Sequence, residues 1–233
     1  MKQQNFFENI NLIKETETDP QIFSIFDNTE ISKILKFYEK LPLATFNEKQ
    51  RIKKKHWLLG IDKEMDSLII NKIDQLLEDW EIDNMYSKED ALGIFHESYN
   101  PIKLHVDTGR DKKKIIYKQA LIPLTDTGDT IIFEPRWYGQ SASFTVKKED
   151  IENNVGYNLR TNDHIGKFDF DKNFYDKYLN HEDYENLRGL SVKKIYNWKL
   201  GEVFVFDRTF IHCASDLKKP KIGLTIFFNK KTI

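Results

Sequence analysis

Apolar side chains recur at helical spacing in two stretches of the N-terminal part of the chain. Asn28 or Thr29 can cap a first helix that ends at about Lys40. A second helix is predicted from about Asp62, and its apolar stripe continues at three- and four-residue intervals to Trp80. Stripes of this kind are usually buried, so both helices are expected to pack on another layer of the protein.

From residue 91 onwards the pattern changes to short apolar or alternating runs that are typical of strands. Turn residues separate these runs, as in TDTGD, and a helical pattern returns only at about 169–190. Strands joined by short turns favour an antiparallel sandwich or barrel. The sequence therefore predicts an α+β, mainly β, protein whose strands are ALGIFHESY, KLHVD, IIYKQALIPL, TIIFEP, SASFTVK, GEVFVFD and KIGLTIFFN.

The length of 233 residues, 39% of them hydrophobic, supports a single domain with one sizeable core. Residues 1–90 are expected to form a helical supporting region, and 91–233 the β-rich core. A segment at about 136–195 is long for a connection and reads as an insertion. Long insertions beside active sites often act as lids, and a lid is the role predicted here.

The charge is balanced, with 36 basic and 37 acidic side chains, which disfavours a nucleic-acid or anionic-membrane partner. The basic run at 51–55 is interpreted as a solvated surface. Cys213 is the only cysteine, so no intrachain disulfide can form and a reducing compartment is expected. No run resembles a signal peptide or a membrane span, which predicts a cytoplasmic protein.

A possible metal site lies at the ends of two predicted strands. His105 and Asp107 are two residues apart on a strand, so their side chains point to the same side and can hold one ion. His212 ends another strand. If these strand ends are neighbours, the two imidazoles and the carboxylate form a facial triad with open positions opposite, as in non-haem iron(II) oxygenases.

Two observations bear on the specificity of this pattern. A second pair, His181 and Asp183, falls in a helical stretch, where positions i and i+2 diverge by about 200°; it is interpreted as a solvated helix face. A histidine near a strand end is usually structural, but Lys221 opens the strand after His212 and can reach the same cavity. Its ammonium can bind a carboxylate there, and Thr225 shares its strand face.

With His105, Asp107, His212 and Lys221 in this order, the chain resembles the 2-oxoglutarate- and iron(II)-dependent oxygenases. The prolyl-hydroxylase-like branch is the most similar in pattern. The segments that carry this resemblance are YNPIKLHVD, YKQALIPLTDTGDTIIFEP, and WKLGEVFVFDRTFIHCAS followed by KIGLTIFF.

The resemblance covers about residues 91–135 and 196–229, and it implies a double-stranded β-helix, or jelly roll. It further implies iron(II) and 2-oxoglutarate as cofactor and cosubstrate, with Lys221 paired to the far carboxylate of 2-oxoglutarate. Tyr99, Gln119 and Thr225 are then expected to line the cosubstrate pocket, although Tyr99 could equally be an ordinary core residue.

Two residues are candidates for contact with the substrate. Alternation along its strand can turn Arg208 into the cavity, where it would contact an anionic substrate or the cosubstrate. The alternative is a surface salt bridge, for instance with Asp207. Trp137 follows the FEP turn and is placed at the start of the substrate region.

The predicted reaction is hydroxylation of a C–H bond with dioxygen, releasing succinate and CO2. Related halogenases lack the carboxylate ligand, whereas this chain keeps Asp107. The expected substrate is a small molecule, an amino acid or a peptidyl residue. Two alternatives stay open: a jelly-roll module that binds a ligand without turnover, and a cupin-like metal enzyme that does not use 2-oxoglutarate.

Overall fold

The structure is a computed structural model that describes residues 8, 10–48, 51–77, 79–82, 91–109, 117–153, 157–159 and 168–230. The helices are α1 (Ile10–Glu15), α2 (Asn28–Lys40), α3 (Lys63–Asp74), α4 (Lys148–Asn153), α5 (Lys172–Tyr178) and the 3-10 helix η1 (Tyr184–Leu187).

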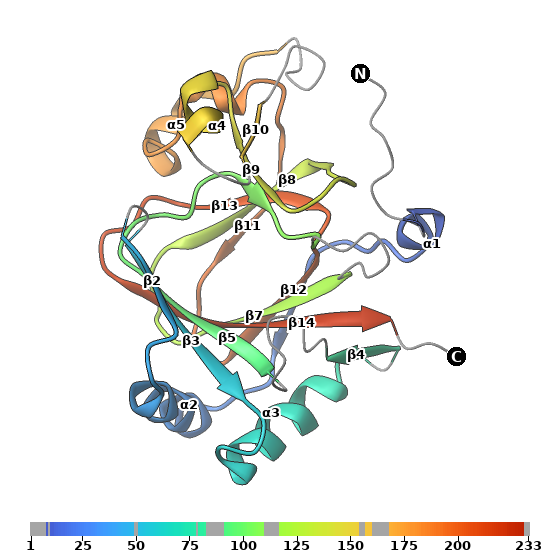
Figure 1. The fold of residues 1–233 in the computed structure, drawn as a ribbon, viewed down its shortest axis with the longest axis vertical. Helices are drawn as coiled ribbons and strands as arrows, with labels where there is room; N and C mark the ends of the chain where they lie inside the picture. The colour runs from blue at the N-terminus through green and yellow to red at the C-terminus, as the bar shows by residue number, and fades with distance from the viewer. Residues whose placement is uncertain are drawn as a thin grey trace.

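The strands form two sheets that face each other (Figure 1). The larger sheet contains β1 (Gln21–Ser24), β2 (Thr45–Asn47), β3 (Ile52–Leu58), β4 (Trp80–Ile82), β5 (Ala91–Ser98), β7 (Lys118–Pro123), β12 (Glu202–Asp207) and β14 (Lys221–Lys230). The smaller sheet contains β6 (His105–Val106), β8 (Asp129–Arg136), β9 (Ala142–Thr145), β10 (Tyr157–Leu159), β11 (Val192–Asn197) and β13 (Phe210–Ala214).

Consecutive core strands alternate between the two sheets. The larger sheet runs in the order β1-β12-β7-β14-β5-β3-β2, with β4 paired to β14, and the smaller in the order β10-β9-β6-β13-β8-β11. From β5 through β8, and again from β11 through β14, every strand therefore lies in the other sheet from the strand before it. This is the connectivity of a jelly roll, which confirms the predicted fold class.

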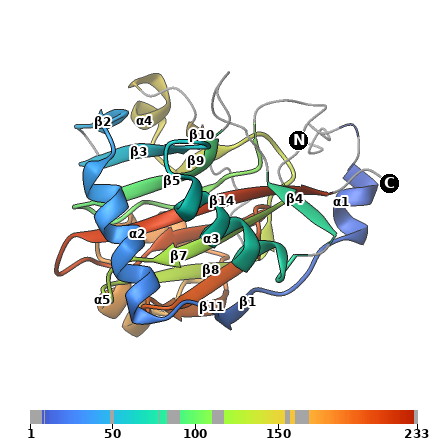
Figure 2. The ribbon, with the colours of Figure 1, turned by 90° about the horizontal axis from the view of Figure 1, so that it is seen from below.

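Helices α2 and α3 cover the outer face of the larger sheet (Figure 2). The capping residue of α2 is Asp27, whose carboxylate accepts from the Glu30 amide. In return, the Glu30 carboxylate accepts from the Asp27 amide. The predicted cap at Asn28 or Thr29 was thus wrong by one or two positions. Helix α3 begins after Asp62 as expected but ends at Asp74, because the chain then turns into β4, where Trp80 pairs with β14.

The N-terminal part of the chain is not only helical, since it adds β1 to β4 to the larger sheet. The basic run at 51–55 lies in and next to β3, not on a fully solvated surface. Lys53 and Lys55 point to the helix side, where their ammonium groups donate to the Tyr99 hydroxyl and the Tyr38 carbonyl oxygen, at 2.7 and 2.8 Å. Lys54 points the other way, between the sheets.

Part of the insertion, β9, β10 and the start of β11, belongs to the smaller sheet itself, whereas the segment from Phe170 to Leu190 packs on the outer face of that sheet (Figure 1). Leu179, Leu187 and Leu190 are 0%, 0% and 3% exposed and share a cluster with Leu104 and Val106 of the smaller sheet. For these residues the predicted lid is wrong, because their apolar side chains are buried against the face of the sheet that is turned away from the cavity. No helix of the described residues is long and apolar enough to cross a bilayer.

Because the insertion completes the core, Leu187→Ala should lower the free energy of unfolding by roughly 2–5 kcal/mol, the usual range for a leucine cavity. Chemical denaturation followed by circular dichroism measures this. Leu43→Ala, at a leucine 53% exposed, is the matched control and should change stability little. Equal small effects of the two substitutions would contradict the view that the insertion is part of the core.

Candidate metal centre

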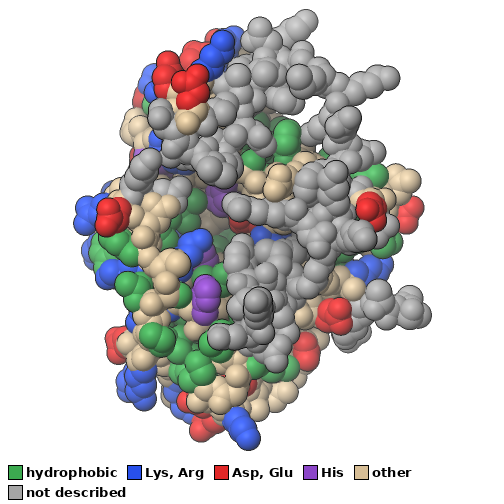
Figure 3. Space-filling model, in the orientation of Figure 1, with side chains coloured by type: hydrophobic (Ala, Val, Ile, Leu, Met, Phe, Trp, Pro, Cys, Tyr) green, Lys and Arg blue, Asp and Glu red, His purple; other side chains and the backbone are tan. Residues whose placement is uncertain are grey.

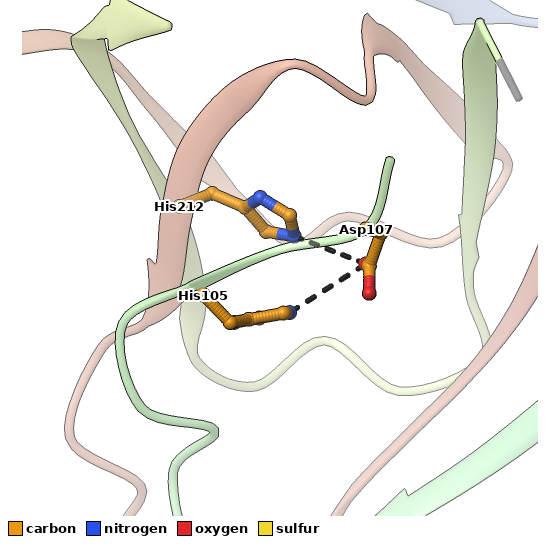
Figure 4. A group of neighbouring side chains, drawn as sticks. All are labelled: His105, Asp107 and His212. Atoms are coloured by element: carbon orange, nitrogen blue, oxygen red, sulfur yellow. Dashed lines mark ion pairs between the residues drawn. The ribbon is translucent and has the colours of Figure 1, made fainter. Parts of the chain in front are cut away.

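The three predicted ligands converge at one point between the sheets (Figure 4). His105 of β6 and His212 of β13 are direct partners in an antiparallel ladder, so both imidazoles leave the same face of the smaller sheet. Asp107 follows β6 and turns back to them. Its Oδ2 lies 3.6 Å from His105 Nε2 and 3.5 Å from His212 Nε2, and the ligand atoms of the three residues lie within 4.8 Å of one another.

Hydrogen bonds orient both imidazoles. His105 Nδ1 lies 2.6 Å from the Lys103 carbonyl oxygen, and His212 Nδ1 lies 2.9 Å from that of Phe210. A carbonyl oxygen can only accept, so each Nδ1 carries the proton and each Nε2 presents its lone pair to the centre. This is the outer-shell arrangement that metal-binding histidines generally use.

Electrostatics also prepares the site for a cation. Burial opposes ionisation of Asp107, yet the neighbouring His105 and His212 and the Arg208 charge together hold its pKa well below the ordinary value. Burial and the His105 charge lower the pKa of His212. Burial also disfavours protonated His105, but the Asp107 carboxylate outweighs it and raises the pKa of His105. A divalent cation bound here would replace that proton, so metal affinity should fall in acid.

The triad opens into a cavity of about 120 Å³ between the two sheets. Figure 3 views the molecule from this side, where histidine side chains and Lys or Arg side chains gather in a hollow. Lys221 lies in the cavity wall and is 5% exposed. Its ammonium donates to the Asp129 carbonyl oxygen at 2.9 Å and lies 3.8 Å from the centre of the Trp198 ring. Burial lowers the pKa of Lys221 to about 7.

Gln119 and Thr225 line the same cavity, as predicted, because the alternation along β7 and β14 turns both side chains inward. Tyr99 does not line it. Ile94, His96 and Ser98 of β5 face the cavity, so the same alternation turns Tyr99 to the helix side with Glu97. There its hydroxyl accepts from Lys53 and donates to Glu97.

Neither predicted substrate residue lines the cavity. Arg208 is 1% exposed, and its guanidinium lies 4.1 Å from the ring centre of Phe227, a residue that does line the cavity. The alternative pairing with Asp207 is also wrong, because that carboxylate binds Lys118 and Arg136 instead. Trp137 packs edge-on against Phe144, and its Nε1 donates to the Gln140 carbonyl oxygen at 3.0 Å.

The second histidine–aspartate pair is not a solvated helix face. His181 and Asp183 lie in the short link between α5 and η1, and His181 Nδ1 lies 2.6 Å from the Asp216 carboxylate. Between them, Glu182 is 5% exposed, and its carboxylate accepts from the Leu104 amide at 2.5 Å. Glu182 therefore holds the backbone immediately before His105, which links the insertion to the strand that carries this candidate ligand.

Several cavity residues were not predicted, among them the polar or aromatic Lys54, His96, Thr130 and Trp198. Trp198 Nε1 donates to the Thr130 hydroxyl at 2.9 Å, which fixes the indole against Lys221. A Cβ at Gly223 would come within 2.5 Å of that indole, so only glycine admits it there. An isolated glycine within a strand, and the alternation of Ile94, His96 and Ser98 along β5, were the sequence signals that could have indicated these residues.

No protein-family model matches the sequence, and no curated protein matches it. Several solved structures share its fold. HygX from Streptomyces hygroscopicus, with nickel and 2-oxoglutarate bound, is 12% identical over 97% of this chain and 89% of its own, with a TM-score of 0.51.

Two further structures give comparable values. A 2OG-Fe(II) oxygenase family oxidoreductase from Burkholderia pseudomallei is 10% identical over 91% of this chain and 84% of its own, with a TM-score of 0.51. The α-ketoglutarate-dependent carbocyclase SnoK from nogalamycin biosynthesis is 12% identical over 94% and 82%, with a TM-score of 0.50. The chain therefore has the fold of the 2-oxoglutarate- and iron(II)-dependent oxygenases.

If Glu182 positions His105, Glu182→Ala should weaken metal binding by about tenfold or more, as expected for loss of a residue that supports a metal ligand. Titration with manganese(II) under anaerobic conditions measures this. The exposed Glu185, changed to Ala, is the control from the same segment and should bind metal as the wild type does. Unchanged affinity in a folded Glu182→Ala protein would show that the strand is held without this carboxylate.

Proposed function

We propose that this protein is an iron(II)- and 2-oxoglutarate-dependent oxygenase that hydroxylates a C–H bond and releases succinate and CO2. The observation that carries the proposal is one cavity lined by two complementary groups. Two imidazoles and a carboxylate line it with their ligand atoms within 4.8 Å of one another, and the buried Lys221 lines it as well.

The donor set fits iron(II). His105, Asp107 and His212 supply two nitrogens and one oxygen from a single side, which leaves the opposite positions open. Bound iron(II) and 2-oxoglutarate would supply the oxidising chemistry with dioxygen, while the protein binds, orients and excludes water. Apolar walls, including Ile94 and Phe206, keep bulk water away from the cavity.

Lys221 favours this function over a metal enzyme that does not use 2-oxoglutarate. Within the described part of the chain, no carboxylate lies within ion-pair distance of its ammonium, and a buried lysine without an anion is costly. A carboxylate of the cosubstrate would satisfy it with a charge-assisted hydrogen bond. Thr225 and Gln119 can add polar contacts along the same wall.

The proposed substrate is a small molecule, an amino acid or a peptidyl residue. HygX has also been solved with hygromycin B, so a protein of this fold binds a small molecule beside its metal and 2-oxoglutarate. The proposal includes Asp107 as a permanent ligand, which favours hydroxylation over chemistry that needs a vacant carboxylate position. Succinate formation from 2-oxoglutarate, with iron and oxygen and a panel of candidate substrates, is the direct assay.

Single substitutions separate the metal ligands from the cosubstrate contact. His105→Ala and His212→Ala should abolish manganese(II) binding. Lys221→Met should keep the metal but weaken 2-oxoglutarate binding roughly 30-fold or more, because truncating one partner of a buried charged pair costs about 2 kcal/mol or more. Calorimetric titration of the metal-loaded protein measures both affinities.

The exposed Lys199, changed to Met, is the matched control and should bind 2-oxoglutarate normally. Metal binding that survives both histidine substitutions would show that the metal binds elsewhere than at the triad. It would argue for a jelly-roll module whose cavity has no metal centre. Unchanged 2-oxoglutarate affinity in metal-loaded Lys221→Met would favour the cupin-like alternative.

The pKa of Lys221 makes cosubstrate affinity depend on pH. Burial lowers this pKa to about 7, whereas a bound carboxylate favours the ammonium and raises it. Above pH 7, binding must therefore take up a proton, and the affinity for 2-oxoglutarate should fall by up to about tenfold per pH unit. Titration calorimetry in buffers with different ionisation enthalpies should detect this uptake at pH 8 in the wild type but not in Lys221→Met. Proton release on binding at that pH would contradict it.

A further inference from the structure

A second cation lines the cavity wall formed by β3 and β5. Lys54 and His96 are direct partners in the antiparallel ladder between these strands, and both side chains line the cavity. Residues paired in this way carry their Cβ atoms about 5 Å apart on the same face of the sheet. The lysine ammonium and the imidazole therefore project together into the space that the metal triad also faces.

The lysines on either side of Lys54 in the sequence lie in a different environment from Lys54. Lys53 and Lys55 point to the opposite face, where each donates to an oxygen of the surrounding protein. The side chain of Lys54 has no hydrogen bond or ion pair with any residue that the structure describes, and the same holds for the side chain of His96. Asp107 is the only carboxylate among the described residues that line the cavity, and it belongs to the metal triad.

The charges of Lys54 and of the Asp107 carboxylate both act on the His96 imidazole. Burial first, and then the Lys54 charge, lower the pKa of His96 to about 3, while the Asp107 carboxylate acts in the opposite direction. The imidazole is therefore neutral near pH 7 and offers one N–H donor. Lys54 beside it provides charge, so together they form a cation with an adjacent neutral donor.

The formal charges of the loaded site leave Lys54 unbalanced. The positive charges of iron(II) and Lys221 are matched by the Asp107 carboxylate and the two carboxylates of 2-oxoglutarate. The Lys54 ammonium then remains without a counter-charge among the described lining residues. A cation in a partly closed cavity attracts an anion, and the remaining component of the reaction is the substrate.

We infer that Lys54, with His96 beside it, binds a carboxylate group of the primary substrate, so that the enzyme acts on a small carboxylic acid. One ammonium with one neutral donor suits a monoanion, whereas a phosphate dianion generally meets several cations or backbone amides. The inference rests on the proposed function for the position of metal and cosubstrate. It narrows the substrate class and assigns recognition to β3 and β5.

The test uses the full chain loaded with zinc(II), as a redox-inert metal, and with 2-oxoglutarate. Acetate is the probe and acetamide its neutral counterpart. Histidine ring signals are followed by nuclear magnetic resonance, and the His96 signal is identified by its loss in His96→Gln. Acetate should shift this signal saturably in the wild type, and acetamide should not.

Lys54→Met should weaken the apparent acetate affinity about tenfold or more, the loss expected for one charge-assisted hydrogen bond. Lys54→Arg, which keeps the charge, should retain most of it. Lys55→Met is the control from the same strand and should respond to acetate as the wild type does. The affinity for 2-oxoglutarate should be unchanged in Lys54→Met.

The outcomes separate this inference from the proposed function. An absent acetate response in the wild type, or an undiminished one in Lys54→Met, overturns the carboxylate site while 2-oxoglutarate still binds. A tenfold loss of 2-oxoglutarate affinity in Lys54→Met makes Lys54 a cosubstrate contact and also overturns it. Failure of the wild type to bind 2-oxoglutarate instead removes the proposed function itself.

Discussion

The direct antiparallel pairing of His105 on β6 with His212 on β13 is the constraint on which the site depends. It brings two imidazoles onto one face of a sheet, although they are far apart along the chain. Asp107 needs only to lie two residues beyond His105 to complete the set of ligands. The strand β6 is short, and Glu182 supports it by accepting from the Leu104 amide, so that the insertion stabilises this strand from behind.

The larger sheet supplies the other side of the cavity, and its charges are distributed by the same alternation. Lys221 and Lys54 both project between the sheets, from β14 and β3, on either side of β5. Their environments differ. Lys221 is buried against Trp198 and titrates near neutrality, whereas Lys54 stands beside the neutral His96. We therefore assign the cosubstrate carboxylate to the first and a substrate carboxylate to the second.

Predictions of side-chain direction succeeded where they used the alternation of a regular strand, and they failed where that alternation was not used or does not apply. Gln119 and Thr225 lie within ladders, and both line the cavity as expected. Tyr99 and Trp137 were not predicted from alternation, and both lie on outer faces, Tyr99 beside Glu97 and Trp137 against Phe144. Arg208 lies in the turn between β12 and β13, so the strand alternation from which its direction was predicted does not apply. A period-two argument is valid only as far as the ladder extends.

The sequence by itself determined the two long N-terminal helices, most of the strands beyond residue 90 and the chemistry of the candidate metal ligands. These are local properties: helical and alternating periods are set by neighbouring residues, and the His105–Asp107 spacing suits a shared ion on any strand. Only the tertiary structure decided that β3 joins the larger sheet with Lys54 facing inward, and that the segment from Phe170 to Leu190 packs behind the smaller sheet. Those choices depend on hydrogen bonding and burial between segments distant in the chain, and no local pattern encodes which surfaces will meet.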